Sequence, residues 1–180
     1  MPSERIVLLD PTVELEDAYR SMVDDYAGTE EKRFRRTPED FAAFVGRLAD
    51  QAAGVGIENG QVPWNTYWLV RGACRGAGAT ILGTSRLRQR LNDHLLITGG
   101  HIGYDIRPSQ RGKGYGRGIL ALTLEKARAM GIDRAMVNCT GSNVASARII
   151  EANGGVLMDE IHSEPMGGML RRYWIELSRK

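Results

Sequence analysis

Apolar residues in the first third of the chain form one short run and then two stretches of helical periodicity. Residues 6–9 are an apolar run that ends at Asp10, which predicts an opening strand and a turn. Residues 13–26 carry apolar side chains at spacings of three and four, which predicts an amphipathic helix with Thr12 as its cap. A second helix is predicted over residues 37–53, and its apolar stripe favours packing on the core over a lid or a partner surface.

The central third of the chain has the composition of strands. Residues 66–70 are rich in aromatic and β-branched side chains, which favour a strand. Residues 80–92 are predicted to form another strand, in which Arg86, Arg88 and Arg90 share one face because they stand at every second position. Both a solvated face and an anion-facing or substrate-facing strip stay open for these arginines, since half-exposed strands commonly alternate in charge.

The last part of the chain alternates strands and helices, with predicted boundaries at 97–106, 114–130, 134–139 and 143–153. This succession implies at least one parallel pair of strands. Two antiparallel closing strands are predicted over residues 156–158 and 170–177. No internal repeat or low-complexity tract marks a second unit, so residues 1–180 are expected to form one domain of mixed α/β class.

Composition sets limits on the partners. The chain has 180 residues, of which 42% are hydrophobic, and a formal net charge of +2 at pH 7. Such a balance lacks the strong field that attracts nucleic acid or an anionic membrane, so neither is expected as a partner. The apolar run at residues 6–9 is too short for a secretion signal or a membrane span, and a cytoplasmic protein is expected.

The two cysteines indicate neither a metal site nor a disulfide framework. Cys74 and Cys139 lie far apart, and no Cys or His stands at zinc-ligand spacing from them. Both are therefore expected to be reduced thiols, and no metal is expected.

The strongest chemical signal is a glycine-rich segment, residues 111–118, between a predicted strand and a predicted helix. Every second residue from Gly112 is glycine. Glycine permits positive φ and a close approach of a ligand to the backbone, so successive N–H groups can converge on one anion. The following helix adds unpaired N–H groups and the positive end of its dipole, which together suit a pyrophosphate.

Two common phosphate-binding patterns do not match this segment. A Walker loop needs Ser or Thr after its Gly-Lys pair, but Gly114 follows Lys113, so that kind of ATP site is excluded. A Rossmann fingerprint needs a third glycine three residues after the second, but Arg117 and Ile119 occupy the two positions where it would stand. No acidic residue follows at the ribose-binding distance. Dinucleotide binding is thus a poor match, and a plain glycine turn without a ligand is the remaining alternative.

Two motifs in order resemble a known superfamily. Residues 106–116 read I-x-P-x-x-R-G-x-G-x-G and resemble the Arg/Gln-x-x-Gly-x-Gly/Ala loop of the GNAT acetyltransferases, whose backbone amides hold the pyrophosphate of coenzyme A. Residues 143–154 resemble the second motif of that superfamily, in which the Asn contacts the coenzyme arm. The resemblance implies the GNAT fold, a central, mostly antiparallel sheet with a splayed parallel strand pair and about four flanking helices. It also implies acetyl-CoA as cosubstrate.

The resemblance further implies where acetyl-CoA binds. Pantetheine is expected between the diverging strands that end near Arg107 and Cys139, where it pairs with strand backbone. The N–H of Tyr104 is expected to bind the thioester oxygen as negative charge develops there, which gives Tyr104 a catalytic role through its backbone. The residues expected to contact the coenzyme are Tyr104, Ile106, Arg107, Arg111, Gly112, Lys113, Gly114, Tyr115, Gly116, Arg117, Asn138, Asn143 and Ser146.

Two departures from the family pattern leave proton transfer open. Ile150 stands where many members carry the Tyr that protonates the leaving thiolate, and Gly100 stands where some carry a Glu base. His101 is the first choice for the base, because its ordinary pKa suits neutral pH. The alternative is that His101 faces the opposite side of its strand and only makes a hydrogen bond in the core.

The resemblance therefore predicts an N-acetyltransferase that acts on a small-molecule or peptide amine by direct attack in a ternary complex. Segments 30–36 and 54–64 and the arginine strand are expected around the acceptor. Two alternatives stay open: a coenzyme A-binding sensor or scaffold without turnover, and a transferase of a longer acyl group, for which the glycines near residue 100 leave room. A homodimer is a further open alternative.

Overall fold

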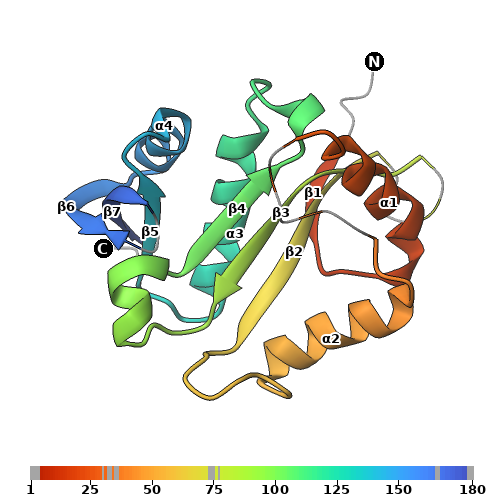
Figure 1. Cartoon of the computed structure of the whole chain (residues 1–180), viewed down its shortest axis with the longest axis horizontal. Helices are drawn as coiled ribbons and strands as arrows, with labels where there is room; N and C mark the ends of the chain where they lie inside the picture. The colour runs from red at the N-terminus through yellow and green to blue at the C-terminus, as the bar shows by residue number, and fades with distance from the viewer. Residues whose placement is uncertain are drawn as a thin grey trace.

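A seven-stranded mixed sheet runs through the computed structural model, which describes residues 5–29, 31, 34, 37–72, 76, 78–164 and 167–177. The strands are β1 (Ile6–Leu9), β2 (Trp64–Arg71), β3 (Thr80–Arg88), β4 (Ile102–Ile106), β5 (Arg134–Thr140), β6 (Val156–Ser163) and β7 (Gly168–Glu176). Their order is β1-β2-β3-β4-β5-β7-β6, and only the pair of β4 and β5 is parallel. The mostly antiparallel sheet expected from the sequence is confirmed (Figure 1).

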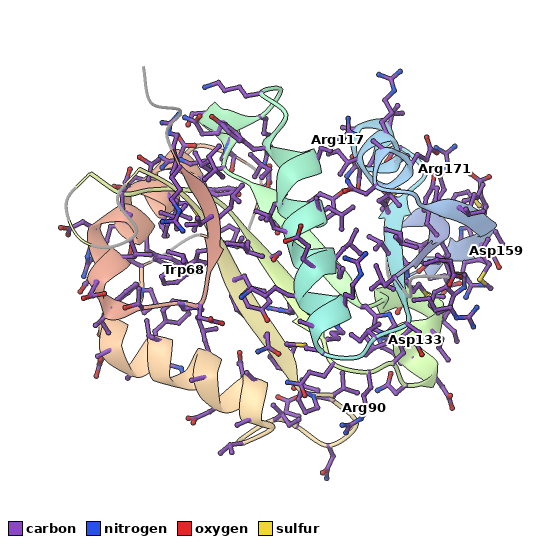
Figure 2. All side chains as sticks on the ribbon, turned by 180° about the vertical axis from the view of Figure 1, so that it is seen from behind. Trp68, Arg90, Arg117, Asp133, Asp159 and Arg171 are labelled. Carbon is purple, nitrogen blue, oxygen red and sulfur yellow. The ribbon has the colours of Figure 1, made fainter. Side chains whose placement is uncertain are left out.

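Four α-helices cover the sheet within the described part of the chain: α1 (Glu16–Asp25), α2 (Phe41–Ala53), α3 (Tyr115–Ala129) and α4 (Val144–Ala152). Helices α1 and α2 pack with Trp68 of β2 in one buried cluster. Helices α3 and α4 pack in a second cluster with the side chains of Tyr67, Ile102 and Val137. The clusters lie on opposite faces of the sheet, with α1 and α2 in front in Figure 1 and α3 in front in Figure 2.

Local capping explains where the first two helices begin and end. The Thr12 hydroxyl accepts a hydrogen bond from Glu14 N–H, as predicted, although a 3₁₀ turn precedes α1. Helix α2 begins at Phe41, later than predicted, because the Asp40 carboxylate accepts the N–H of Ala43 at 2.8 Å. It ends at Ala53, and Gly54 caps it with a φ of 76°, the left-handed conformation that glycine adopts at low cost.

The predicted strand over residues 97–106 is wrong in its first half. A π-helical turn spans Leu95–Gly99, and β4 begins only at Ile102. The Asn92 side chain accepts Leu95 N–H at 2.9 Å and so starts a helical turn, and Gly100 then reverses the chain with a φ of 65°. Likewise β3 ends at Arg88, so Arg90 lies beyond the strand that was predicted to include it.

The remaining predicted elements are present with shifted ends. The two closing strands are longer than predicted, and they pair antiparallel as expected. Cys139 is a buried free thiol, whereas Cys74 lies outside the described residues. Within the part of the chain that the structure describes, no helix is long and apolar enough to cross a membrane.

The sheet divides between β4 and β5. Register along this parallel pair is limited to Ile102 opposite Val137, whereas β3 and β4 pair over five residues. Beyond Ile102, β4 continues beside β3 while β5 continues beside β7. The sheet therefore has an opening between β4 and β5, which begins after the paired residues Ile102 and Val137 and extends toward the carboxyl ends of the two strands.

Candidate functional site

The main chain of β4 turns toward this opening at Tyr104. Arg88 N–H donates to the His101 carbonyl at 2.8 Å, and Arg107 N–H donates to the Leu82 carbonyl at 3.0 Å. Both bonds join β4 to β3, and along a strand successive residues turn their N–H and C=O groups to opposite edges. The N–H and C=O of Tyr104 therefore face β5, where no strand residue is paired opposite them.

The main chain of β5 turns toward the same opening at Asn138. Leu177 N–H donates to Asp133 O at 2.8 Å and Gly141 N–H donates to Met169 O at 2.7 Å, so odd-numbered residues of β5 face β7. Even-numbered residues such as Asn138 consequently face β4. Tyr104 and Asn138 thus present strand backbone from the two sides of the opening, as the resemblance predicted for a pantetheine site.

The Asn138 side chain provides an independent sign of a ligand. Its amide nitrogen and oxygen are both buried, and neither has a hydrogen-bond partner within the described residues. Because Ile102 and Val137 are paired and share one face, Asn138 and Gly103 share the other. Buried polar groups in proteins are nearly always hydrogen-bonded, so this amide fits a ligand that offers both a donor and an acceptor.

The glycine-rich loop lies directly before α3. Gly112 and Gly114 have φ values of 74° and 85°, which favour glycine. The first helical hydrogen bonds run from Arg117 and Gly118 to the Gly114 carbonyl, so the N–H groups of residues 112–116 precede the hydrogen-bonded helix. A Cβ added at Gly114 meets no atom within 4 Å, so there is open space beside the loop. These features match an anion site at a helix N-terminus.

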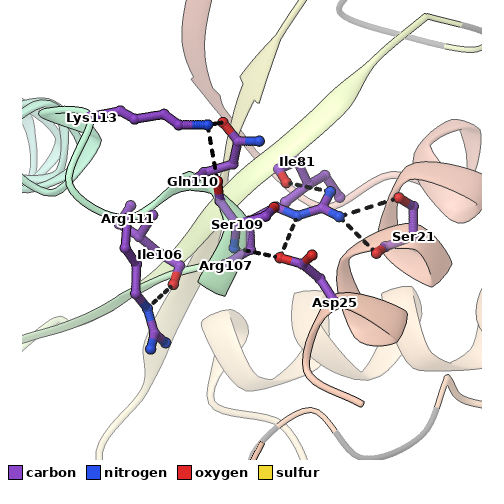
Figure 3. Close-up of polar contacts among 9 residues, drawn as sticks. All are labelled: Ser21, Asp25, Ile81, Ile106, Arg107, Ser109, Gln110, Arg111 and Lys113. Atoms are coloured by element: carbon purple, nitrogen blue, oxygen red, sulfur yellow. Dashed lines mark hydrogen bonds and ion pairs between the residues drawn. The ribbon is translucent and has the colours of Figure 1, made fainter. Parts of the chain in front are cut away.

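Charged side chains of the loop bond residues that precede it in the chain (Figure 3). The Arg111 guanidinium donates to Ile106 O at 2.9 Å and pairs with Glu31 at 2.7 Å. The Lys113 ammonium donates to Ser109 O at 2.9 Å. The carbonyl of Ile106, a predicted coenzyme contact, is therefore already bonded to Arg111.

The side chain of Arg107 points away from the loop. Its Nε lies 3.2 Å from the Asp25 carboxylate, and its terminal nitrogens donate to the carbonyls of Ser21 at 2.9 Å and Ile81 at 3.4 Å (Figure 3). The same Asp25 oxygen accepts Ser109 N–H at 2.9 Å. The geometry thus gives the Arg107 side chain a structural contact with α1, and a contact of Arg107 with the coenzyme stays a prediction.

The start of α3 packs closely on neighbouring elements. The Tyr115 hydroxyl accepts a hydrogen bond from Arg71 at 3.4 Å. A Cβ at Gly116 would come within 2.6 Å of the Ile149 side chain, so glycine lets α3 approach α4. Arg117 O accepts a hydrogen bond from Asn153 at 3.3 Å, and Arg117 is labelled in Figure 2. Arg117 therefore contacts Asn153 through its main-chain carbonyl, and its side chain lies at the end of α3 that follows the glycine-rich loop.

The second motif lies at the start of α4 and reaches across the opening. Asn143 caps α4 by accepting Ser146 N–H at 3.0 Å. The hydroxyls of Ser146 and Tyr104 are 2.9 Å apart, which links α4 to β4. Burial raises the pKa of Tyr104 to about 12, so this phenol stays protonated at neutral pH.

His101 is buried in a position unfavourable for a base. The side chain is only 7% exposed, its Nδ1 accepts Met136 N–H at 3.0 Å, and its ring lies beside Trp174. Burial, with a smaller effect from Arg88, lowers the pKa of His101 to about 4. The catalytic role of His101 stays a prediction, and these contacts favour its structural alternative.

A cavity of about 230 Å³ lies on the α1 and α2 side of the sheet and reaches β4 at Gly103 and Asp105. Asp105 is next to Tyr104 in the chain, and alternation along β4 turns its side chain to this face. Sequence reasoning missed Asp105. The signal available was its place one residue beyond Tyr104 in a strand of alternating faces.

A family model decides the classification. The model that describes the GNAT acetyltransferase domain matches residues 5–156. The chain belongs to this family. Membership in the GNAT acetyltransferases agrees with the loop before α3 and with the opening between β4 and β5. No match was found among curated protein sequences.

Solved structures share the GNAT fold with this chain at low sequence identity. The microcin C7 self-immunity acetyltransferase MccE, in complex with acetyl-CoA and AMP, has a TM-score of 0.67 and 16% identity, with 97% of this chain and 93% of that chain covered. A GNAT-family acetyltransferase from Bacillus anthracis has a TM-score of 0.64 and 17% identity, with coverage of 98% and 97%. The spermidine/spermine N-acetyltransferase SpeG from Vibrio cholerae has a TM-score of 0.58 and 13% identity, with coverage of 96% and 95%.

Proposed function

We propose that residues 1–180 form one domain that transfers an acetyl group from acetyl-CoA to a primary amine. The observation that carries this proposal is the opening between β4 and β5, with the backbone of Tyr104 and Asn138 turned into it and an anion-binding loop beside it. The MccE structure contains acetyl-CoA, and the name of SpeG assigns it N-acetylation of spermidine, which supports a common chemistry on this fold.

In this proposal the loop and the opening bind the two ends of acetyl-CoA. The N–H groups of residues 112–116 bind the pyrophosphate at the positive end of α3. Tyr104 and Asn138 bind pantetheine as neighbouring strands would, and the unsatisfied Asn138 amide supplies a further donor and acceptor. Ser146 stands next to the opening because its hydroxyl bonds that of Tyr104, and Asn143 caps the same end of α4.

The Tyr104 N–H then stabilises the transition state by donating to the thioester oxygen as that oxygen becomes negative. The acceptor amine approaches through the cavity next to Gly103 and attacks the thioester carbon directly. Its proton passes to Asp105 or to water, because His101 uses Nδ1 as an acceptor for Met136 N–H. Ile150 in place of a tyrosine is tolerable, since a thiol pKa near that of Cys permits departure as the thiolate.

Substitution of Gly114 tests the proposal. Valine there must adopt a φ of about 85° and occupies the open space beside the loop, so acetyl-CoA affinity is expected to fall by at least about tenfold in calorimetry. The matched control is Gly118→Val, because Gly118 lies inside α3 and a Cβ there also meets no atom within 4 Å. Equal acetyl-CoA affinity in the two folded variants would contradict the proposed function.

Two readouts separate the alternative functions. Mass spectrometry of the ligand carried through purification distinguishes an acetyl group from a longer acyl group. Release of coenzyme A without transfer to any amine of a broad panel, combined with tight acetyl-CoA binding, is the expected result for a sensor or scaffold. The absence of a tyrosine at Ile150 and of a carboxylate at Gly100 is the observation that keeps this second function open.

A further inference from the structure

Two cavities on the acceptor side of the sheet meet along β3. The first, of about 230 Å³, reaches β4, and the second, of about 180 Å³, extends toward the loop before β2 and the turn after β3. Arg86 and Arg88 line both cavities. The two arginines therefore stand where the two cavities adjoin, and the first cavity begins next to the reacting position.

Neighbouring groups hold these two guanidinium groups in position. Arg86 and Arg88 share one face of β3 because Leu87 between them is fully buried on the other. The Arg88 guanidinium donates to the carbonyls of Gly99 and Gly100 at 3.2 and 3.0 Å. The Arg86 guanidinium lies over the Trp64 ring, 5.2 Å from its centroid. Such anchoring lowers the entropy that an arginine loses when it binds an anion.

Strand register sets the distance from these arginines to the reacting position. Arg86 is paired with Gly103, the residue before Tyr104, and Thr84 is paired with Asp105. Paired residues have Cα atoms roughly 5.5 Å apart, and Arg88 stands about 7 Å farther along β3. An acceptor whose nitrogen lies beside Gly103 thus meets a guanidinium within a few bonds of that nitrogen.

The wall opposite the arginines is apolar. Tyr19, Phe44 and Leu48 of α1 and α2 line the first cavity together with Trp68 of β2. The Tyr19 ring packs on the rings of Phe44 and Trp68 at centroid distances of 5.2 and 5.3 Å, so the aromatic members of this wall support one another. Asp105 adds a negative group at the end of the cavity next to Tyr104.

We propose that the acceptor is a primary amine with an apolar or aromatic body and an anionic group, a carboxylate or a phosphate, within a few bonds of the nitrogen. The inference rests on the proposed function and names the acceptor class of that same site. Arg86 and Arg88 bind the anion, the aromatic wall binds the apolar body, and Asp105 lies with the amine. The distribution of charge along the cavity matches that of such an acceptor.

A matched set of acceptors tests the proposal. The set is 2-phenylethylamine, phenylalanine and phenylalaninol phosphate, which share an aromatic body and differ in the anion. The expected result is a kcat/KM higher by about tenfold to a hundredfold for at least one anionic acceptor over 2-phenylethylamine, which is the range of charge-assisted hydrogen bonds. Preference between carboxylate and phosphate identifies the anion. Equal kcat/KM for all three overturns the inference while leaving acetyl transfer itself intact.

Three arginine variants assign the preference to residues. Arg86→Met and Arg88→Met are expected to reduce the anionic-to-neutral ratio of kcat/KM, whereas Arg90→Met is the control because Arg90 is exposed and lies beyond β3. Arg88 also donates to the carbonyls of Gly99 and Gly100, so Arg88→Met can lower the stability of the fold. If this variant unfolds at a lower temperature than the wild type, Arg86→Met decides the outcome. An unchanged ratio in folded Arg86→Met contradicts the assignment.

A binding measurement keeps the inference separate from catalysis. Calorimetry with N-acetylphenylalanine and N-acetyl-2-phenylethylamine compares the two products without turnover. Tighter binding of the anionic product that is lost in Arg86→Met supports the acceptor class. It does so even when no amine is acetylated, because the lack of acetylation contradicts only the proposed function. Equal binding of both products contradicts the acceptor class.

Discussion

At the scale of single residues, burial changes what a titratable side chain is able to do. His101 has an ordinary pKa suited to catalysis at neutral pH, but in the fold it is 7% exposed and its Nδ1 is occupied by Met136 N–H. Asp105, by contrast, lines the acceptor cavity one residue beyond Tyr104. Four positions along the chain thus separate a buried imidazole just before β4 from a carboxylate that lines the cavity.

His101 should make stability depend on pH. Its pKa falls from 6.5 to about 4 on folding, so between these values the unfolded chain binds more protons. The contribution to the free energy of unfolding is fully present above pH 6.5 and declines as pH falls toward 4, by about 3 kcal/mol at 1.36 kcal/mol per pKa unit. His101→Asn removes this titration, and its amide oxygen can still accept Met136 N–H.

Urea unfolding at pH 7, 5.5 and 4.5 measures the effect. The wild-type protein should lose more stability across this series than His101→Asn, with all other titrating groups common to both. Parallel stability curves would mean that His101 is not buried in its neutral form. The kcat/KM of the variant at neutral pH tests the catalytic role separately: a full rate supports a structural histidine.

At the scale of elements, one largely buried ion pair joins α1 to the segment between β4 and the glycine-rich loop. Asp25 ends α1, Arg107 follows β4, and Ser109 lies two residues before the loop. One Asp25 carboxylate oxygen contacts both the Arg107 Nε and the Ser109 N–H (Figure 3). Burial raises the pKa of Asp25, but the Ser109 N–H bond and the bonds and charge of Arg107 outweigh it and hold the pKa below its ordinary value. The loop position thus depends on α1.

Asp25→Asn should weaken this connection. The neutral amide leaves Arg107 partly uncompensated in a site where its side chain is 10% exposed, and the expected loss is about 3 kcal/mol in the free energy of unfolding. Because folding lowers the pKa of Asp25, its contribution to the free energy of unfolding is present above the unfolded pKa near 3.9. That contribution is lost as pH falls through the pKa of Asp25 in the folded protein.

Asp24→Asn is the matched control, since Asp24 is the exposed neighbour in the same turn of α1. Thermal unfolding and the KM for acetyl-CoA are measured for both variants. A KM increase in Asp25→Asn alone is expected, because Ser109 N–H loses its charged acceptor. Equal behaviour of the two variants would show that the pair does not position the loop.

At the scale of the whole molecule, the sheet has two parts with few connections. Strands β1 to β4 and strands β5 to β7 meet at the pair of Ile102 and Val137, beside the bonds of His101 to Met136. Packing of α3 on α4 at Gly116 and Ile149 adds a second connection. A ligand bound in the opening contacts both parts and should therefore stabilise the whole sheet.

Acetyl-CoA should raise the stability of the protein by about 2.7 kcal/mol at a concentration of 100 times its Kd. Hydrogen exchange should slow most at the amides of Tyr104 in β4 and Asn138 in β5, which face the opening. Amides of β1 serve as the internal control, and Gly114→Val as the variant control. Equal protection across β1, β4 and β5 would contradict binding in the opening.

Much of this architecture follows from local sequence. The glycines of residues 112–116 require positive φ and a close approach wherever the chain goes, and Asn143 is a cap next to its helix in sequence. The order of strands and helices, the parallel pair and the glycine loop were predictable for that reason. The structure of residues 97–106 was not predictable, because the periodicity of a short apolar run does not distinguish a strand from a helical turn. The bond of the Asn92 side chain to Leu95 N–H starts a helical turn there.

The sequence by itself determined the family, the element order and the glycine-rich loop before α3, because each depends on residues that are neighbours in the chain. The tertiary structure alone decided the surroundings of His101, Arg107 and Asp105. His101 bonds a residue 35 positions away, and Arg107 bonds one 82 positions away. Contacts over such separations are set by packing, so no local pattern shows which charged side chain turns to the cavity and which turns to the core.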